Sequence, residues 1–222
     1  MKVKVVKKIL EANDRIAEAN RRMLAENEVF SLNLMSAPGA GKTTLLSRTI
    51  EALGKKIRFG VIEGDIQGTH DAEVISSLGV PVVQINTEGA CHLDANMINE
   101  ILPQMPLSEM DLLVVENVGN LVCPAEFDVG ESSKVMLLSI TEGDDKPLKY
   151  PLMFQMSEVL IVNKVDLVPH LDVSLEKIRG DAKSLNPKLE IFEVSCKTGE
   201  GLDAWYLWLE ERRGSQSLHG AL

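Results

Sequence analysis

The chain has few cysteines, and it has too few basic residues to balance its acidic ones. Its three cysteines form an odd count without close spacing, so a disulfide framework is not expected, while metal or thiol chemistry stays open. Lys and Arg total 23 against 33 Asp and Glu, a net charge of −10, which argues against nucleic acid or an anionic membrane as a partner. Binding of an anionic ligand must therefore depend on local donors.

The chain also has no long apolar run. No stretch approaches the roughly 20 residues that span a bilayer, and the basic start MKVKVVKK leads into a charged amphipathic segment, not into a signal-peptide core. We therefore expect a cytoplasmic protein without a membrane partner. The 222 residues, 45% of them apolar, suit one α/β domain with a substantial core, and we find no internal repeat.

Residues 36–44, with the sequence SAPGAGKTT, lie between an apolar run and a helical pattern, which is the setting of a phosphate-binding loop. Such a loop points backbone N–H groups at phosphates, while Lys42 adds a charge and Thr43 offers a hydroxyl to Mg²⁺. Ser36 stands where the usual pattern has its first glycine, so the pattern does not define the geometry of the first turn. The Lys42 and Thr43 contacts do not depend on that position. The alternative is a glycine-rich turn beside a helix cap. The predicted nucleotide contacts are Gly39, Ala40, Gly41, Lys42, Thr43 and Thr44.

A second motif, NKVD at 163–166, ends another apolar strand and predicts the base. The Asp166 carboxylate can accept two hydrogen bonds from guanine, whereas adenine offers the opposite donor and acceptor pattern. Asn163 is expected to tie this motif to the phosphate loop, and the stem of Lys164 to cover one face of the base. Residues 195–197 resemble the loop that touches the guanine oxygen in GTPases. GTP is thus the predicted nucleotide, with contacts at Asn163, Lys164, Asp166, Ser195, Cys196 and Lys197.

Helical spacing of apolar residues over 3–26 predicts one amphipathic helix before the first strand. Helix and strand patterns then alternate, which implies a mainly parallel β-sheet with helices on both faces. The expected strands lie at 29–34, 57–62, 80–85, 111–116, 135–140, 159–163 and 189–194, and the expected helices at 45–53, 71–78, 92–102, 172–185 and 201–213. The sequence thus divides into an N-terminal helix at 1–28, a P-loop GTPase domain at 29–213 and a flexible tail at 214–222.

Two carboxylates follow strands whose carboxyl ends should face the phosphates. Asp65 comes shortly after the strand at 57–62, and Glu116 ends the strand at 111–116. Either could hold Mg²⁺ and orient the attacking water, because a transferred phosphoryl group needs positioning and charge neutralisation more than covalent help. Lys42, Asp65 and Glu116 are the catalytic candidates, and Thr43, Asp65 and Glu116 the predicted magnesium ligands. The alternative is a pair of solvated loop carboxylates.

Cys91, His92 and Cys123 could together hold a second metal ion, because thiolate and imidazole suit Ni²⁺ and Zn²⁺. Cys91 and His92 stand at the expected start of the helix at 92–102, where both can turn toward one ion and the helix dipole lowers the thiol pKa. A fourth ligand would be water, a carboxylate or a residue of a second subunit. Residues 116–123 join the two metal sites, so a γ-phosphate could reshape the second one. Buried structural cysteines are the alternative.

These residues resemble the HypB family of nickel-insertion GTPases in [NiFe]-hydrogenase maturation. The resemblance is carried by the phosphate loop, EGDI at 63–66, residues 86–95, ENVGNLVCPAEFD at 116–128, TEGDDKPLKYP at 141–151 and NKVD at 163–166. It implies a GTP-dependent homodimer of the SIMIBI class of P-loop proteins, with nickel or zinc bound by Cys91, His92 and Cys123 at the subunit interface. It also implies a small nickel- and zinc-binding chaperone and the hydrogenase large-subunit precursor as partners.

The predicted function is therefore a GTP-hydrolysing metallochaperone that uses GTP, Mg²⁺ and Ni²⁺ or Zn²⁺. A urease-maturation GTPase shares the class and the metal, but the ENVGNLVCP stretch favours the hydrogenase branch. A metal-carrying adaptor would use GTP only as a slow conformational switch. A radical-enzyme chaperone GTPase shares the fold but has no use for the Cys-His-Cys set. Many relatives carry an N-terminal cysteine motif or a histidine-rich tract, and this sequence shows neither.

Overall fold

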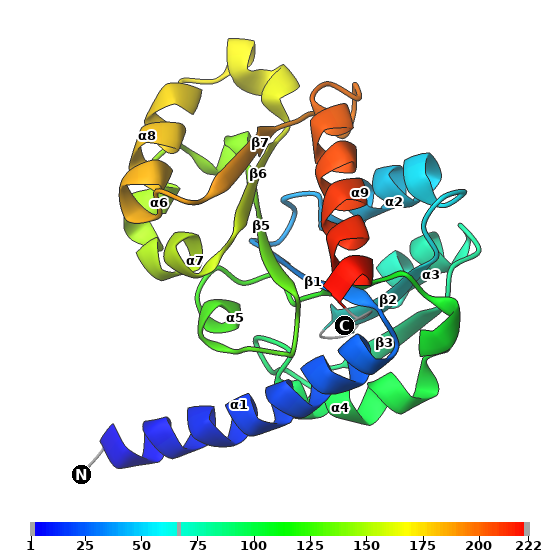
Figure 1. The fold of residues 1–222 in the computed structure, drawn as a ribbon. Helices are drawn as coiled ribbons and strands as arrows, with labels where there is room; N and C mark the ends of the chain where they lie inside the picture. Colours follow the sequence, from blue (N-terminus) through cyan, green and yellow to red (C-terminus); the bar gives the residue numbers. More distant parts are fainter. Residues whose placement is uncertain (1–2, 66–67, 220–222) are drawn as a thin grey trace.

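The computed structural model describes residues 3–65 and 68–219, and it describes side chains for 10–65 and 68–214. Ile66, the last residue of the EGDI motif, and residues 220–222 of the expected tail lie outside the described residues. The described chain builds a seven-stranded, all-parallel sheet in the order β3-β2-β4-β1-β5-β6-β7 (Figure 1). The strands are β1 Phe30–Ser36, β2 Phe59–Asp65, β3 Val82–Asn86, β4 Leu112–Glu116, β5 Ser133–Ser139, β6 Val159–Asn163 and β7 Glu190–Glu193.

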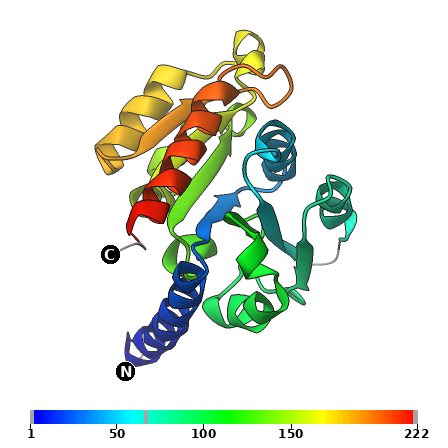
Figure 2. The same ribbon diagram turned by 45° about the vertical axis from the view of Figure 1, so that its right-hand side comes forward.

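Helices cover both faces of this sheet, as the alternating pattern predicts. One face carries α2 Lys42–Leu53, α3 His70–Ser76 and α9 Leu202–His219. The other carries α1 Val3–Glu26, α4 Ala95–Ile101, α5 Cys123–Glu126, α6 Lys146–Lys149, α7 Pro151–Met156 and α8 Leu175–Leu185. Helices α1 and α4 lie side by side in both views (Figures 1 and 2). The predicted fold class is confirmed.

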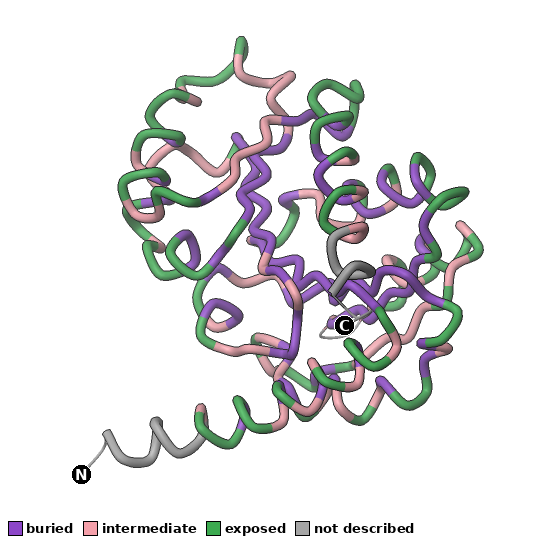
Figure 3. Tube along the Cα trace, in the orientation of Figure 1, coloured by how far each residue is buried: buried purple, intermediate pink, exposed green. Residues whose placement is uncertain are grey.

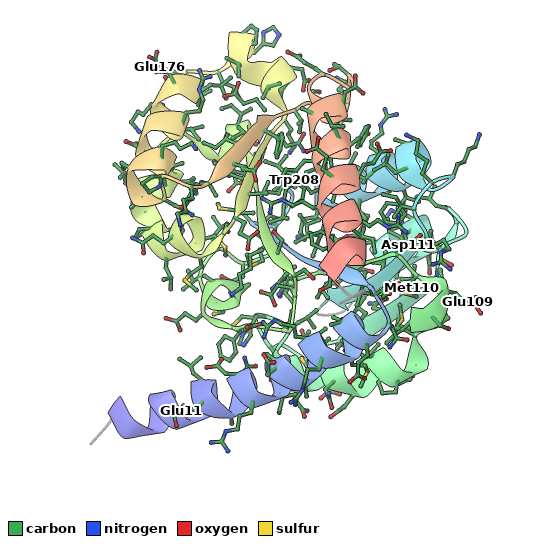
Figure 4. All side chains as sticks on the ribbon, in the orientation of Figure 1. Glu11, Glu109, Met110, Asp111, Glu176 and Trp208 are labelled. Atoms are coloured by element: carbon green, nitrogen blue, oxygen red, sulfur yellow. The ribbon has the colours of Figure 1, made fainter. Side chains whose placement is uncertain are left out.

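The core lies on both faces of the strands, which are the most continuously buried part of the chain (Figure 3). Under α9, the rings of Trp205 and Trp208 stack with centroids 5.3 Å apart, and Trp208 is labelled in Figure 4. Trp205 Nε1 also donates a hydrogen bond to Thr49 Oγ1 of α2, at 3.0 Å. The helix that follows the phosphate loop is thus fixed to the last helix of the domain.

An ion-pair cluster fixes α9 to the start of β4 on the same face. Asp111, labelled in Figure 4, accepts hydrogen bonds from Arg58 at 3.0 Å and from Arg213 of α9 at 2.6 Å. The hydrogen bonds from Arg58 hold the pKa of Asp111 well below its ordinary value. Its carboxylate is therefore a stabilising group at neutral pH.

The predicted helix at 92–102 is wrong at its start. Helix α4 begins at Ala95, because Asp94 takes the capping position and accepts from Met97 N at 2.9 Å. Cys91 and His92 consequently lie in the loop before the helix. At the other end of the chain, α9 continues through His219, six residues beyond the expected boundary at 213. No described helix is long and apolar enough to cross a membrane.

Short elements without a clear sequence pattern were not predicted. They are α5, α6, α7 and the 3₁₀ turns η1 Leu102–Gln104, η2 Leu107–Glu109, η3 Ile140–Glu142 and η4 Val165–His170. Each spans six residues or fewer, too few to set up a 3.6-residue period. Helix α5 begins at Cys123, one of the three predicted metal ligands.

Candidate nucleotide and metal sites

The phosphate loop leaves β1 at the centre of the sheet and ends at the first turn of α2. Gly39 and Gly41 have φ of 73° and 102°, a region that favours glycine. A Cβ on Gly41 would lie 2.6 Å from Asn163 Nδ2, so a larger residue would have to displace that amide. Asn163 Nδ2 in turn donates to Ala40 O at 3.0 Å. The expected tie between this loop and the NKVD motif is therefore present.

The predicted base-binding residues gather beside this loop. Asn163 Oδ1 accepts from Cys196 N at 3.1 Å, and Ser195 Oγ donates to Asp166 Oδ1 at 2.6 Å. Lys164 Nζ donates to Gly39 O at 2.8 Å, which lays its stem between the two loops. Burial raises the pKa of Cys196 to about 11, so this thiol stays protonated and its backbone N–H is the part in use. Thr44 and Lys197 lie exposed at the rim.

At the phosphate end, acidic side chains and a lysine surround a cavity of about 270 Å³. Its charged lining residues are Lys42, Glu63, Asp65, Asp71 and Glu116. Thr43 Oγ1 donates to Glu116 Oε1 at 3.0 Å, and Lys42 Nζ donates to Ser36 Oγ at 3.2 Å. Asp65 is the last residue of β2, and its Oδ2 accepts from Gly68 N at 3.0 Å. The catalytic candidates Lys42, Asp65 and Glu116 thus line one cavity.

Two buried carboxyl groups in this cavity fit a divalent cation. Glu63 and Glu116 are paired in register on neighbouring strands, and each is 3% exposed. Burial raises the pKa of Glu63 to about 8 and that of Glu116 to about 7, although Lys42 and Thr43 oppose the shift at Glu116. The Oε2 atom of each has no hydrogen-bond partner. Mg²⁺ prefers such oxygen ligands and would supply the missing positive charge.

Glu63 and Asp71 were not predicted as members of this site. Glu63 ends up here because β2 runs three residues beyond its expected end at 62, so residues 63 and 65 share one face of the strand. The sequence indicated this role only through the EGDI motif, in which Glu63 stands two residues before Asp65. Asp71 comes from the first turn of α3, and only the packing of that helix brings it to the cavity.

The three predicted metal ligands lie together in the structure. Their ligand atoms all fall within 4.8 Å of one another, with Cys91 Sγ 2.9 Å from Cys123 Sγ and 3.5 Å from His92 Nδ1. Burial lowers the pKa of His92, which favours the neutral ring that coordinates metals, and the hydrogen bond with Cys91 raises the pKa of Cys123. The His92 ring packs on Phe127 at 4.0 Å. The S₂N donor set fits Ni²⁺ or Zn²⁺.

The two sites are connected through the loop that contains His92. Asn117, directly after Glu116, is 1% exposed, and its Oδ1 accepts from Leu93 N at 3.0 Å. The Leu93 side chain packs on Gly64, where a Cβ would lie 2.7 Å from Leu93 Cδ1. Gly64 separates Glu63 from Asp65, so the residue after His92 touches β2 and the residue that directly follows β4. Sequence reasoning singled out residues 116–123 but not this contact.

Comparisons with known proteins find similar sequences and similar folds. The family "CobW/HypB/UreG, nucleotide-binding domain" matches residues 31–193. Hydrogenase maturation factor HypB of Azotobacter vinelandii is 50% identical over 214 residues, which cover 96% of this chain and 71% of that protein. The crystal structure of hydrogenase maturation factor HypB from Archaeoglobus fulgidus matches with a TM-score of 0.87 at 40% identity, over 91% of this chain and 99% of the other. The structure of HypB from Helicobacter pylori in complex with nickel matches with a TM-score of 0.86 at 36% identity, over 92% and 96%.

Proposed function

Because this chain belongs to the CobW/HypB/UreG family, and within it to the HypB branch, we propose that it is a GTP-hydrolysing nickel metallochaperone of hydrogenase maturation. It inserts nickel into the large-subunit precursor of a [NiFe]-hydrogenase. The names of the relatives support the pathway, and the relative from Helicobacter pylori supports the metal because it was solved with nickel. A small nickel- and zinc-binding chaperone is the proposed partner for metal transfer.

In the nucleotide site, Asp166 selects guanine. The hydrogen bond from Ser195 Oγ orients the Asp166 carboxylate and supports this role. Lys42 and the backbone of residues 39–44 bind the phosphates. Mg²⁺, when bound, supplies charge neutralisation, and Thr43, Asp65 and Glu116 would hold it. Asp65, at the end of β2, would orient the attacking water. Glu63 adds a second buried acceptor beside Glu116.

On the metal side, Cys91, His92 and Cys123 hold the nickel cargo, with Zn²⁺ as an alternative occupant. Three ligands leave a fourth position, which a second subunit fills in a homodimer formed on GTP or metal binding. The observation that carries the coupling of the two sites is the contact of Leu93 with both Asn117 and Gly64. A change at the γ-phosphate moves the ends of β2 and β4, and both of these ends touch the residue beside His92.

Equilibrium nickel binding tests the proposal. The protein is titrated with Ni²⁺ in the apo state, with GDP, and with a non-hydrolysable GTP analogue plus Mg²⁺, while its mass in solution and phosphate release from GTP are recorded. Affinity and mass should change with the nucleotide, and Cys91→Ala should remove tight nickel binding. Identical nickel binding in every state, or full binding by Cys91→Ala, would contradict the proposal. Absence of multiple-turnover phosphate release would instead favour a metal-carrying adaptor that uses GTP only as a slow conformational switch.

A further inference from the structure

Helix α1 buries two asparagines on the face that it turns toward α4 and β1. Asn13 is 7% exposed and Asn20 is 0% exposed, and the spacing of seven residues puts both on one side of the helix. Ala17, between them, is also fully buried. Packing alone would favour apolar residues here, since a buried amide costs free energy unless its hydrogen bonds are made.

Each of these amides bridges the same two segments of the chain. Asn13 Nδ2 donates to Asp128 O at 2.8 Å, and its Oδ1 accepts from Ala95 N at 2.9 Å. Asn20 Nδ2 donates to Ala95 O at 2.8 Å and to Val129 O at 3.0 Å. The two side chains therefore hold residue 95 on one side and residues 128 and 129 on the other.

Those two segments are the ones that carry the metal ligands. Ala95 is three residues after His92 and starts α4, and Asp128 is five residues after Cys123. Phe127, the neighbour of Asp128, carries the ring that packs on His92 at 4.0 Å. A shift of residue 95 relative to residue 128 would therefore change the spacing between His92 and Cys123.

The contact between α1 and the loop at 127–131 is close and specific. Gly130 has φ of 95°, and a Cβ on it would lie 2.6 Å from Asn20 Cβ and 2.7 Å from Ala17 O. Arg21 also reaches the loop, since it donates to Asp128 Oδ2 at 2.6 Å. Fully hydrogen-bonded buried groups of this kind define one arrangement of the segments that they join.

We propose that α1 is a brace for the metal site and that Asn13 and Asn20 are positioning residues, which hold the Cys91–His92 loop and the Cys123 segment at ligand spacing. The proposal rests on the proposed nickel site and adds the element that keeps it assembled. Groups that orient metal ligands from outside the coordination sphere are typically worth about 10- to 100-fold in metal affinity. We expect a loss in this range from either amide.

The test uses the full chain with Asn13→Ala or Asn20→Ala, and it measures the Ni²⁺ dissociation constant by chelator competition together with the thiolate-to-nickel absorption band. The dissociation constant should rise about tenfold or more while GDP affinity is kept. Asn27→Ala is the matched control, because the Asn27 amide, in the turn that follows α1, donates back to Met23 O of that helix. If both variants bind GDP normally and keep the wild-type nickel affinity, the brace is overturned.

A second measurement covers the case in which Asn20→Ala does not fold. If α1 holds the ligands at spacing, nickel must in return stabilise the docked helix, so Ni²⁺ should slow hydrogen exchange of the Ala95 amide and of α1 in the unaltered protein. Unchanged exchange would overturn the proposal. Failure of the nickel site itself is recognised separately. If Cys91→Ala and Cys123→Ala keep the wild-type nickel affinity, both the site and its brace are overturned. If these two variants lose nickel affinity but Asn13→Ala keeps it, only the brace is overturned.

Discussion

Replacement of Asn117 should separate the nucleotide site from the metal site. The Asn117 side chain makes three hydrogen bonds in the core: it accepts from Leu93 N and Val118 N at 3.0 Å each and donates to Asn33 Oδ1 at 3.0 Å. At about 1 kcal/mol net for each hydrogen bond, Asn117→Ala should lower the free energy of unfolding by about 3 kcal/mol. A domain of this size can tolerate that loss and still bind nucleotide.

The informative readout is the nickel affinity in two nucleotide states. Coupling between two sites is typically worth about 5- to 150-fold in affinity, so the ratio of nickel dissociation constants with GDP and with a GTP analogue is the quantity to compare. Asn117→Ala should bring this ratio toward one, because Leu93 loses its bond to the end of β4. Urea unfolding of the same samples measures the loss of stability separately.

Asn186→Ala is the matched control for that experiment. Asn186 likewise joins two elements. It follows α8, and its amide donates to the backbone oxygen of Ser157, the residue after α7, at 2.8 Å. Its loss should lower stability but leave the nickel ratio intact. A wild-type ratio of nickel dissociation constants in Asn117→Ala would refute the proposed connection. If the ratio approaches one in both variants, the effect comes from general destabilisation of the domain and not from the Leu93 contact.

Three further predictions concern the base, the phosphate loop and the acid stability of the fold. Asp166→Asn replaces an acceptor by a donor toward guanine, so GTP affinity should fall at least about 100-fold in competition with a labelled guanine nucleotide; a smaller change would argue against guanine selection by this residue. Gly41→Ala forces a Cβ toward Asn163 at positive φ, and GDP affinity should fall roughly tenfold or more, as calorimetry would detect. Asp111 has a lowered pKa from its bonds with Arg58, so its stabilisation is present at neutral pH and is lost as pH falls below about 4. Asp111→Asn should therefore be less stable than the wild type at pH 7 in urea, with a difference that shrinks by pH 3, and a constant difference would contradict this assignment.

The sequence predicted those features that depend on local pattern. Strands such as Val159–Asn163 have continuous apolar runs, and the phosphate loop is recognisable because glycine, lysine and threonine must stand at fixed spacing. The strand order then brings the ends of β1, β2 and β4 together, so that Lys42, Asp65 and Glu116 meet. These residues could be chosen in advance because their positions relative to strand ends are set by a parallel sheet.

The features that sequence reasoning missed depend on contacts between distant segments. Nothing near Asn13 indicates that its amide will reach Asp128, 115 residues away. The start of α4 was misplaced because the apolar pattern continues through Leu93, and only the capping bond of Asp94 ends it. Likewise, the contact of Leu93 with β2 depends on Gly64, which has no side chain at that position and lies 29 residues earlier in the sequence.

The pair of stacked tryptophans has a practical consequence. Trp205 and Trp208 are the two tryptophans of the chain, and both lie on α9. Indole fluorescence responds to the groups that surround the ring, and Trp205 is hydrogen-bonded to the helix that begins at the phosphate loop. Emission from the unlabelled protein therefore reports on the surroundings of α2, and the metal loop contributes no indole signal of its own. Stopped-flow mixing with nucleotide can thus follow binding at the phosphate loop over time without an attached dye.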